Sequence, residues 1–186
     1  MALRLALLDP NPATVYLARP CQYVLQEAPG ACRESYWTDE RFSEAVIRSM
    51  DRALEALKAA AGAQRVELVG YSGGGAVAAL VAARREDVIS LMTVAGNLDT
   101  EEVSRIHRVS PLKNSLNPMG VAHRIRGIPQ VHFVGAADKV VTPVVAERFR
   151  AASGAPDRVR IRIIEGVSHD TGWAERWPEL LADAPE

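Results

Sequence analysis

The stretch VELVGYSGGGAVAALVAARR at positions 66–85 decides the fold of this chain. It opens with a short apolar, β-prone run at 66–69 and continues, after the glycines, as an apolar helix expected over 76–85. Between these two elements, residues 70–74 match the pattern G-x-S-x-G. A very tight turn from a buried strand into a helix projects the central hydroxyl beyond the sheet. The stretch therefore predicts a nucleophile elbow with Ser72 at its tip.

The residues around Ser72 have separate expected roles in this elbow. In so tight a turn, side chains at Gly70 and Gly74 would collide with the neighbouring strand and helix, so glycine is expected at both positions. The backbone N–H of Gly73 follows the serine at a helix N-terminus and is the expected oxyanion donor. Tyr71 completes the elbow. A chance cluster of glycines would not also place a strand before the serine and a helix after it.

Strands and helices are expected to alternate along the rest of the chain. The expected strands lie at 14–18, 66–69, 89–95, 130–134 and 158–164, and the expected helices at 42–61, 76–85, 144–152 and 171–182. This alternation predicts an α/β fold, in which a mainly parallel sheet of about five to six strands carries helices on both faces. Residues 97–127, which include two prolines, are expected to be irregular and to form a cap or substrate loop.

A serine hydroxyl is a weak nucleophile and needs a base, for which the chain offers four histidines. His169 directly follows the last expected strand, which places it at the carboxyl edge of the sheet and after Ser72 in sequence. We expect it to be the base. His132 lies inside an expected strand and is interpreted as a packed or half-exposed residue, not as the base. His107 and His123 fall in the irregular segment, where each is either a surface residue or a residue of the substrate pocket.

The base needs an acid that orients it and stabilises its charged form. Asp138 follows the fourth expected strand and lies between Ser72 and His169 in sequence, as the order serine, acid, histidine requires. Asp99 follows the third expected strand and is the alternative acid. An ordinary turn aspartate is the competing interpretation for both. The sequence favours Asp138.

Composition limits the class of protein. With 186 residues, of which 48% are hydrophobic and 24% charged, the chain suits one domain over 1–186. A net charge of −1 does not argue for nucleic acid or an anionic membrane as a partner. No apolar run approaches the roughly 20 residues of a membrane span. The pair His169-Asp170 has no further ligands at metal spacing, so neither a metal nor another cofactor is expected.

Two cysteines, Cys21 and Cys32, lie eleven positions apart in a stretch with proline and glycine. They favour a disulfide and hence an oxidising compartment, and the alternative is two unrelated thiols in a cytosolic protein. Residues 1–8 are too short for a signal peptide and lack its cleavage site, so no export signal is expected in this chain. Alanine and leucine dominate these residues, which favours a helix.

The sequence as a whole resembles the α/β-hydrolase superfamily from Thr14 onward. The motifs that carry the resemblance are GYSGGG at 70–75, VHFVGAADKVV at 131–141 and IIEGVSHDTGW at 163–173. The resemblance implies a serine hydrolase that cleaves a carboxylic ester or a related acyl bond of a small molecule. Thioester or amide cleavage and acyl transfer use the same residues. A non-catalytic member of the fold, which binds a ligand or partner in the same pocket, is the alternative.

The stretch YLARPCQY at 16–23, followed by Cys32 and Trp37, resembles a bacterial subgroup of exported hydrolases. That resemblance implies a disulfide between Cys21 and Cys32 and a periplasmic location, with the cytoplasm as the alternative. The family also places a strand before Thr14, and the loop after that strand provides a second oxyanion N–H. Nothing before Thr14 matches it, so the resemblance implies an N-terminal truncation. The expected strands at 14–18 and 66–69 would then either pair directly or leave apolar edges exposed. The oligomeric state has no signature in the sequence.

Overall fold

The computed structural model describes residues 1–23 and 32–185. In this part of the chain, four strands form one parallel sheet in the order β1-β2-β3-β4, so strands that follow one another in sequence lie side by side. The strands are β1 (Val66–Tyr71), β2 (Val88–Val94), β3 (Gln130–Gly135) and β4 (Val159–Ile164). The prediction of an α/β fold with a parallel sheet is confirmed, but with four strands in place of about five to six.

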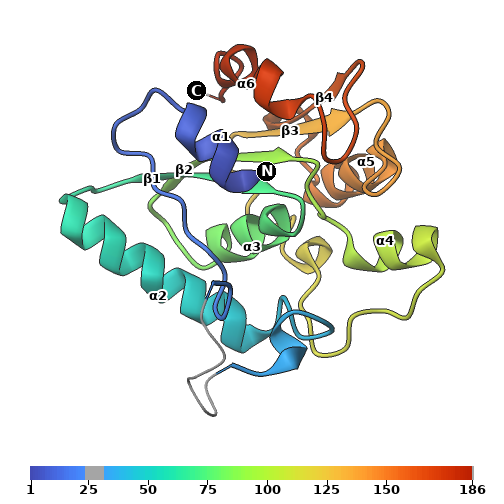
Figure 1. Ribbon diagram of the computed structural model, residues 1–186, viewed down its shortest axis with the longest axis horizontal. Coiled ribbons are helices and arrows are strands. Elements are labelled where there is room, and N and C mark those ends of the chain that lie inside the picture. Colours follow the sequence, from blue (N-terminus) through green and yellow to red (C-terminus); the bar gives the residue numbers. More distant parts are fainter. Residues whose placement is uncertain (24–31, 186) are drawn as a thin grey trace.

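Helices cover both faces of this sheet (Figure 1). The α-helices are α1 (Ala2–Leu8), α2 (Glu44–Ala61), α3 (Gly73–Ala82), α4 (Thr100–His107), α5 (Pro143–Ser153) and α6 (Trp173–Leu181). Short 3-10 turns are η1 (Glu34–Tyr36), η2 (Pro118–Gly120) and η3 (Pro156–Arg158). The helix expected at the N-terminus is therefore present as α1.

The core lies in two layers, one on each face of the sheet. On one face, α1 and α6 bury Leu5 and Trp177 against the strands. On the other face, α3 and α5 bury Ala79 and Phe149. Helix α2 packs on the outer side of α3, where Ile47 is fully buried. Because every strand is parallel, all four carboxyl ends meet at one edge of this layered core.

The strand expected at 14–18 is not formed, which corrects the sequence-based prediction. Its residues are apolar and β-prone, but a strand also needs a hydrogen-bonded neighbour, and within the described residues this run has no ladder partner. Strand β1 is consequently an edge of the sheet. Of the two outcomes expected for this edge, exposure is the one observed, since Val69 is 43% exposed.

The segment 97–127 is only partly irregular, because α4 forms within it. Asp99 is its N-cap and accepts a hydrogen bond from the backbone N–H of Glu102 at 3.1 Å. Val103 and Ile106 pack against the core from the helix. Two apolar residues among charged ones give a weak periodic pattern, so a helix of this length escapes recognition from the sequence.

His132 is a packed residue on β3, as its position in an expected strand predicted. It is fully buried, its Nδ1 lies 2.9 Å from Thr93 Oγ1, and its ring meets Phe149 edge to face. Burial lowers the pKa of His132 from 6.5 to about 3. The folded protein therefore keeps this imidazole neutral at pH values at which the unfolded chain binds a proton.

This difference predicts an acid-sensitive stability. Between pH 6.5 and pH 3 the unfolded state binds more protons than the folded state, so stability falls as the pH falls. From pH 6.5 to 4.5 we expect the free energy of unfolding to drop by about 2 kcal/mol through His132. In His132→Asn, which keeps a polar group for Thr93, the loss over this range should shrink correspondingly. Urea unfolding at several pH values measures both slopes, and equal slopes would exclude His132 as the cause.

Candidate functional site

The turn between β1 and α3 consists of Ser72 alone, in a strained backbone conformation. Its φ and ψ are 52° and −121°, in the positive-φ range that costs an L-residue about 1–3 kcal/mol. Three backbone hydrogen bonds of 2.9 Å hold it there. Ser72 N–H donates to the carbonyl of Val94, and the carbonyl of Ser72 accepts from the N–H groups of Gly75 and Asn97. The end of β2 therefore fixes the orientation of Ser72.

Close backbone approach explains two glycines near this turn. A Cβ on Gly70 would lie 2.4 Å from the carbonyl oxygen of Gly74, so no other residue fits there without a shift. A Cβ on Gly74 would meet nothing within 4 Å, and the steric reason expected for this glycine is wrong. The second glycine without room for a side chain is Gly75, because a Cβ there would lie 2.8 Å from the Cα of Gly96. The third glycine of the run GGG is the sequence feature that marks it.

Gly73 is the first residue of α3, so its N–H has no acceptor inside the helix. The ring of Phe42 lies beside it, with Cζ 3.3 Å from the position that a Cβ of Gly73 would occupy. Phe42 is itself 1% exposed. An aromatic ring therefore closes one side of the elbow, a contact between residues 31 positions apart that the sequence did not indicate.

The structure brings Ser72, His169 and Asp138 into one hydrogen-bonded row. Ser72 Oγ lies 2.9 Å from His169 Nε2, and His169 Nδ1 lies 2.9 Å from Asp138 Oδ2. Asp138 follows β3 and His169 follows β4, so all three side chains stand at the carboxyl edge of the sheet. The side chain of Asp138 is fully buried, and its Oδ1 accepts hydrogen bonds of 2.8 Å from the N–H groups of Val140 and Val141.

Two side chains hold the loop that carries His169. The indole N–H of Trp173 donates to the carbonyl oxygen of His169 at 2.9 Å. The hydroxyl proton of Tyr71 is shared between the same carbonyl, at 2.9 Å, and Asp170 Oδ1, at 2.7 Å. Burial and the neighbouring Asp170 raise the pKa of Tyr71 above its ordinary value, so this hydroxyl stays protonated and remains a donor. The function of Trp173 was not predicted, although it lies inside the motif at 163–173.

The other candidate residues lie elsewhere. Asp99 accepts hydrogen bonds from Asn117 and pairs with Arg148 Nε at 2.8 Å, so its oxygens are used at the start of α4 and not at His169. Burial alone would raise the pKa of Asp99, but Arg148 and the hydrogen bonds hold it below its ordinary value. His107 contacts the carbonyl of Val140, and His123 lies against Arg126.

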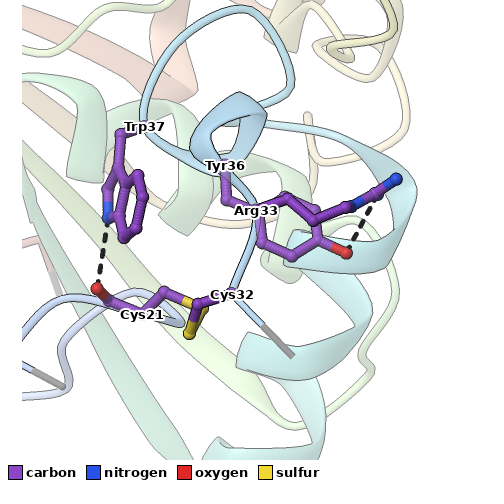
Figure 2. The surroundings of a disulfide bond; sticks show 5 residues. All are labelled: Cys21, Cys32, Arg33, Tyr36 and Trp37. Carbon is purple, nitrogen blue, oxygen red and sulfur yellow. Dashed lines mark hydrogen bonds between the residues drawn. A yellow bond between two sulfur atoms is a disulfide. The ribbon is translucent and has the colours of Figure 1, made fainter. Parts of the chain in front are cut away.

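A disulfide joins Cys21 and Cys32 (Figure 2). The indole N–H of Trp37 donates to the carbonyl oxygen of Cys21 at 3.2 Å and ties this loop to η1. Within the described residues, no helix combines the length and the hydropathy that crossing a membrane requires. The same part of the chain holds no cluster of three or more histidine, cysteine or acidic residues suited to a metal ion.

Solved structures with a similar backbone fold place this chain in a known fold. A puromycin-hydrolysing peptidase of Mycobacterium tuberculosis aligns with a TM-score of 0.60 and 20% identity over 76% of this chain and 25% of its own. An esterase of Pyrococcus furiosus aligns with a TM-score of 0.58 and 13% identity over 75% of this chain and 62% of its own. An α/β-hydrolase enzyme from the sediment metagenome of the Mar Chica lagoon aligns with a TM-score of 0.54 and 22% identity over 74% of this chain and 68% of its own. The chain has the α/β-hydrolase fold.

The α/β-hydrolase fold of this chain is therefore established by structure and not by sequence similarity. No protein-family model and no curated protein matches the sequence. The chain spans about a quarter of the length of the puromycin-hydrolysing peptidase, which is 25% covered. At these identities the likeness extends to the fold alone.

The two glycines of the elbow provide a test of its geometry. Gly70→Ala forces a Cβ against the carbonyl of Gly74, and we expect a loss of about 2 kcal/mol or more in the free energy of unfolding. Gly74→Ala adds the same methyl group in open space within α3, where alanine is the better helix former, and we expect a gain of up to about 1 kcal/mol. Urea unfolding monitored by tryptophan fluorescence measures both, and equal losses would contradict the close approach.

Proposed function

We propose that this chain is a serine hydrolase that cleaves a carboxylic ester or a related acyl bond of a small molecule through a covalent acyl-enzyme. The observation that carries the proposal is the row of 2.9 Å contacts from Ser72 Oγ to His169 and from His169 to Asp138. A nucleophile within hydrogen-bond reach of a base, which a third group orients, is the arrangement that acyl transfer requires.

Each residue has a definite part in the proposed reaction. His169 Nε2 takes the proton of Ser72 as Oγ attacks the acyl carbonyl carbon, and the imidazolium then protonates the leaving alcohol. Water activated by the same nitrogen releases the acid and restores Ser72. The carbonyl oxygen becomes negatively charged in both tetrahedral intermediates, and the N–H of Gly73 donates to it at the N-terminus of α3.

Asp138 orients the base and stabilises its positive charge. Its Oδ2 accepts from His169 Nδ1, which leaves Nε2 as the nitrogen that faces Ser72. Its other oxygen accepts two backbone hydrogen bonds, from Val140 and Val141. These bonds fix the orientation of the buried carboxylate.

The alternative of a non-catalytic binding protein has less support. Binding alone requires neither a strained serine backbone at φ 52° nor an imidazole 2.9 Å from its hydroxyl. The names of the structural neighbours, an esterase and a peptidase among them, agree with acyl-bond hydrolysis and leave ester, thioester and amide bonds open. Acyl transfer to an acceptor other than water would use the same residues. The disulfide favours an oxidising compartment, such as the periplasm, as the place of action.

Fluorophosphonate labelling tests the nucleophile directly. We expect the purified chain to react at Ser72, as mapped by mass spectrometry, because only a serine activated by a base attacks the phosphorus readily. Labelling should vanish in Ser72→Ala and should persist in Ser49→Ala, which changes an exposed serine on α2. Folded protein that resists the reagent at Ser72 would refute the proposed hydrolase.

The support of the His169 loop predicts a positioning role for Tyr71. In Tyr71→Phe the shared hydroxyl proton is lost, and we expect kcat for a p-nitrophenyl ester to fall about tenfold while KM changes little, since one hydrogen bond contributes about 1 kcal/mol or somewhat more. The control is Tyr36→Phe, which removes a surface hydroxyl that bonds Arg33 (Figure 2). A purely structural role would lower the fraction of active protein in a titration of Ser72 and leave kcat per active site unchanged.

A further inference from the structure

The segment 16–23 carries a cation that the proposed reaction does not use. Arg19 is partly buried, and its Nη1 donates to the carbonyl of Arg41 at a long 3.4 Å. Its guanidinium carbon lies 6.0 Å from the centroid of the Phe42 ring. Among the residues that the structure describes, no carboxylate pairs with Arg19. Most of its five N–H donors thus have no partner among the residues that the structure describes.

Other shielded arginines in this protein are neutralised. Arg85 is bound by three carboxylates, those of Asp51, Glu55 and Asp87, at 2.6–2.8 Å. Arg19 instead has a second cation as its neighbour. Burial and the charge of Arg41 lower the pKa of Arg19, which agrees with two positive groups that lie close together without a counter-ion.

Arg41 has the same deficit of negative partners. Its Nε donates to the carbonyl of Thr38 at 2.5 Å, and no carboxylate contacts it within the described part of the chain. Two neighbouring arginines therefore have no carboxylate partner within the described residues. A guanidinium matches the two oxygens of a carboxylate and binds them through paired hydrogen bonds.

The cations lie next to the elbow. The ring of Phe42 is near both the cation and the elbow. Arg19 lies over this ring, and Phe42 Cζ stands 3.3 Å from the position that a Cβ of Gly73 would occupy. The Phe42 ring is therefore a neighbour both of the Arg19 guanidinium and of the residue that follows Ser72. Arg19 is therefore a candidate partner for an anionic group of a molecule held at Ser72.

The loop that carries Arg19 is held in place by several bonds. Its backbone N–H donates to Gln22 Oε1 at 3.3 Å, and the disulfide of Cys21 follows two residues later. Trp37 donates to the carbonyl of Cys21 from η1 (Figure 2). A fixed loop reduces the conformational entropy that a binding residue loses when its ligand arrives.

We propose that Arg19, assisted by Arg41, binds a carboxylate of the substrate, so that the substrates are esters that carry a negative charge a few bonds from the scissile carbonyl. The assignment of a substrate rests on the proposed hydrolase function. The anion site itself does not, because it consists of the two arginines alone.

A binding experiment tests the anion site without turnover. The probes are adipate, which has two carboxylates, and 1,6-hexanediol, an uncharged molecule of the same length, added to Ser72→Ala in a calorimeter. We expect adipate to bind and the diol not to, and we expect Arg19→Gln to weaken adipate about tenfold or more. Arg52→Gln, a change of an exposed arginine on α2, should leave adipate binding unchanged. Arg41→Gln, on the second cation, provides a variant for the case that Arg19→Gln fails to fold.

A kinetic experiment tests the substrate class. Wild-type protein is assayed with the p-nitrophenyl monoester of adipic acid and with p-nitrophenyl hexanoate, which has the same chain length and no charge. We expect kcat/KM to be about tenfold higher for the anionic ester than for the uncharged one. In Arg19→Gln the two values should become equal, and in Arg19→Lys part of the preference should return.

The two proposals fail in different ways. If Ser72 is labelled by a fluorophosphonate but adipate does not bind and the two esters react alike, the anion site is refuted and the hydrolase stands. If adipate binding depends on Arg19 but Ser72 is not labelled, the hydrolase is refuted and the anion site stands. Adipate binding that is equal in wild type, Arg19→Gln and Arg41→Gln would also refute the anion site.

Discussion

The contact between the backbones of Gly70 and Gly74 is the constraint on which the rest of the structure depends. It allows α3 to leave β1 after a single residue, and that residue, Ser72, must then adopt a positive φ. Hydrogen bonds hold this strain: Ser72 N–H donates to the carbonyl of Val94, at the end of β2, and the N–H of Asn97 donates to the carbonyl of Ser72. Strand β1, Ser72 and helix α3 therefore form one rigid unit. A displacement of α3 would move the hydroxyl of Ser72 away from His169.

The parallel sheet explains why distant residues meet at Ser72. The loops after β1, β3 and β4 leave the same edge, but β1 and β4 are separated by three strand spacings, roughly 14 Å in all. The loop after β4 must return over this width to bring His169 to Ser72. Tyr71, at the end of β1, and Trp173, on α6, both donate to the carbonyl oxygen of His169. The protein thus anchors this long loop at His169 itself, from two different elements.

Local patterns predicted the elbow, and nonlocal contacts explain what the sequence did not reveal. The run 66–85 combines strand, turn and helix signatures within one stretch, so Ser72 could be placed without the fold. The strand expected at 14–18 depended on a neighbour elsewhere in the chain, and propensity alone cannot supply one. The run GGG marks Gly75 and Gly74 alike, and only the fold shows that Gly75, beside Gly96, is the one without room for a Cβ. The approach of Arg19 to Phe42 likewise has no sequence pattern.

The distribution of charge gives the elbow its electrostatic character. With 22 basic and 23 acidic residues, the chain has enough carboxylates to pair its arginines, yet three of them surround Arg85 and none meets Arg19 within the described residues. The N-terminus of α3, at Gly73, adds a positive partial charge beside the same Phe42 ring. Both features favour negative charge beside Ser72. In the proposed acyl transfer, the helix end is the group that stabilises the developing charge. The guanidinium groups without a carboxylate partner among the described residues are the basis for proposing an anionic substrate.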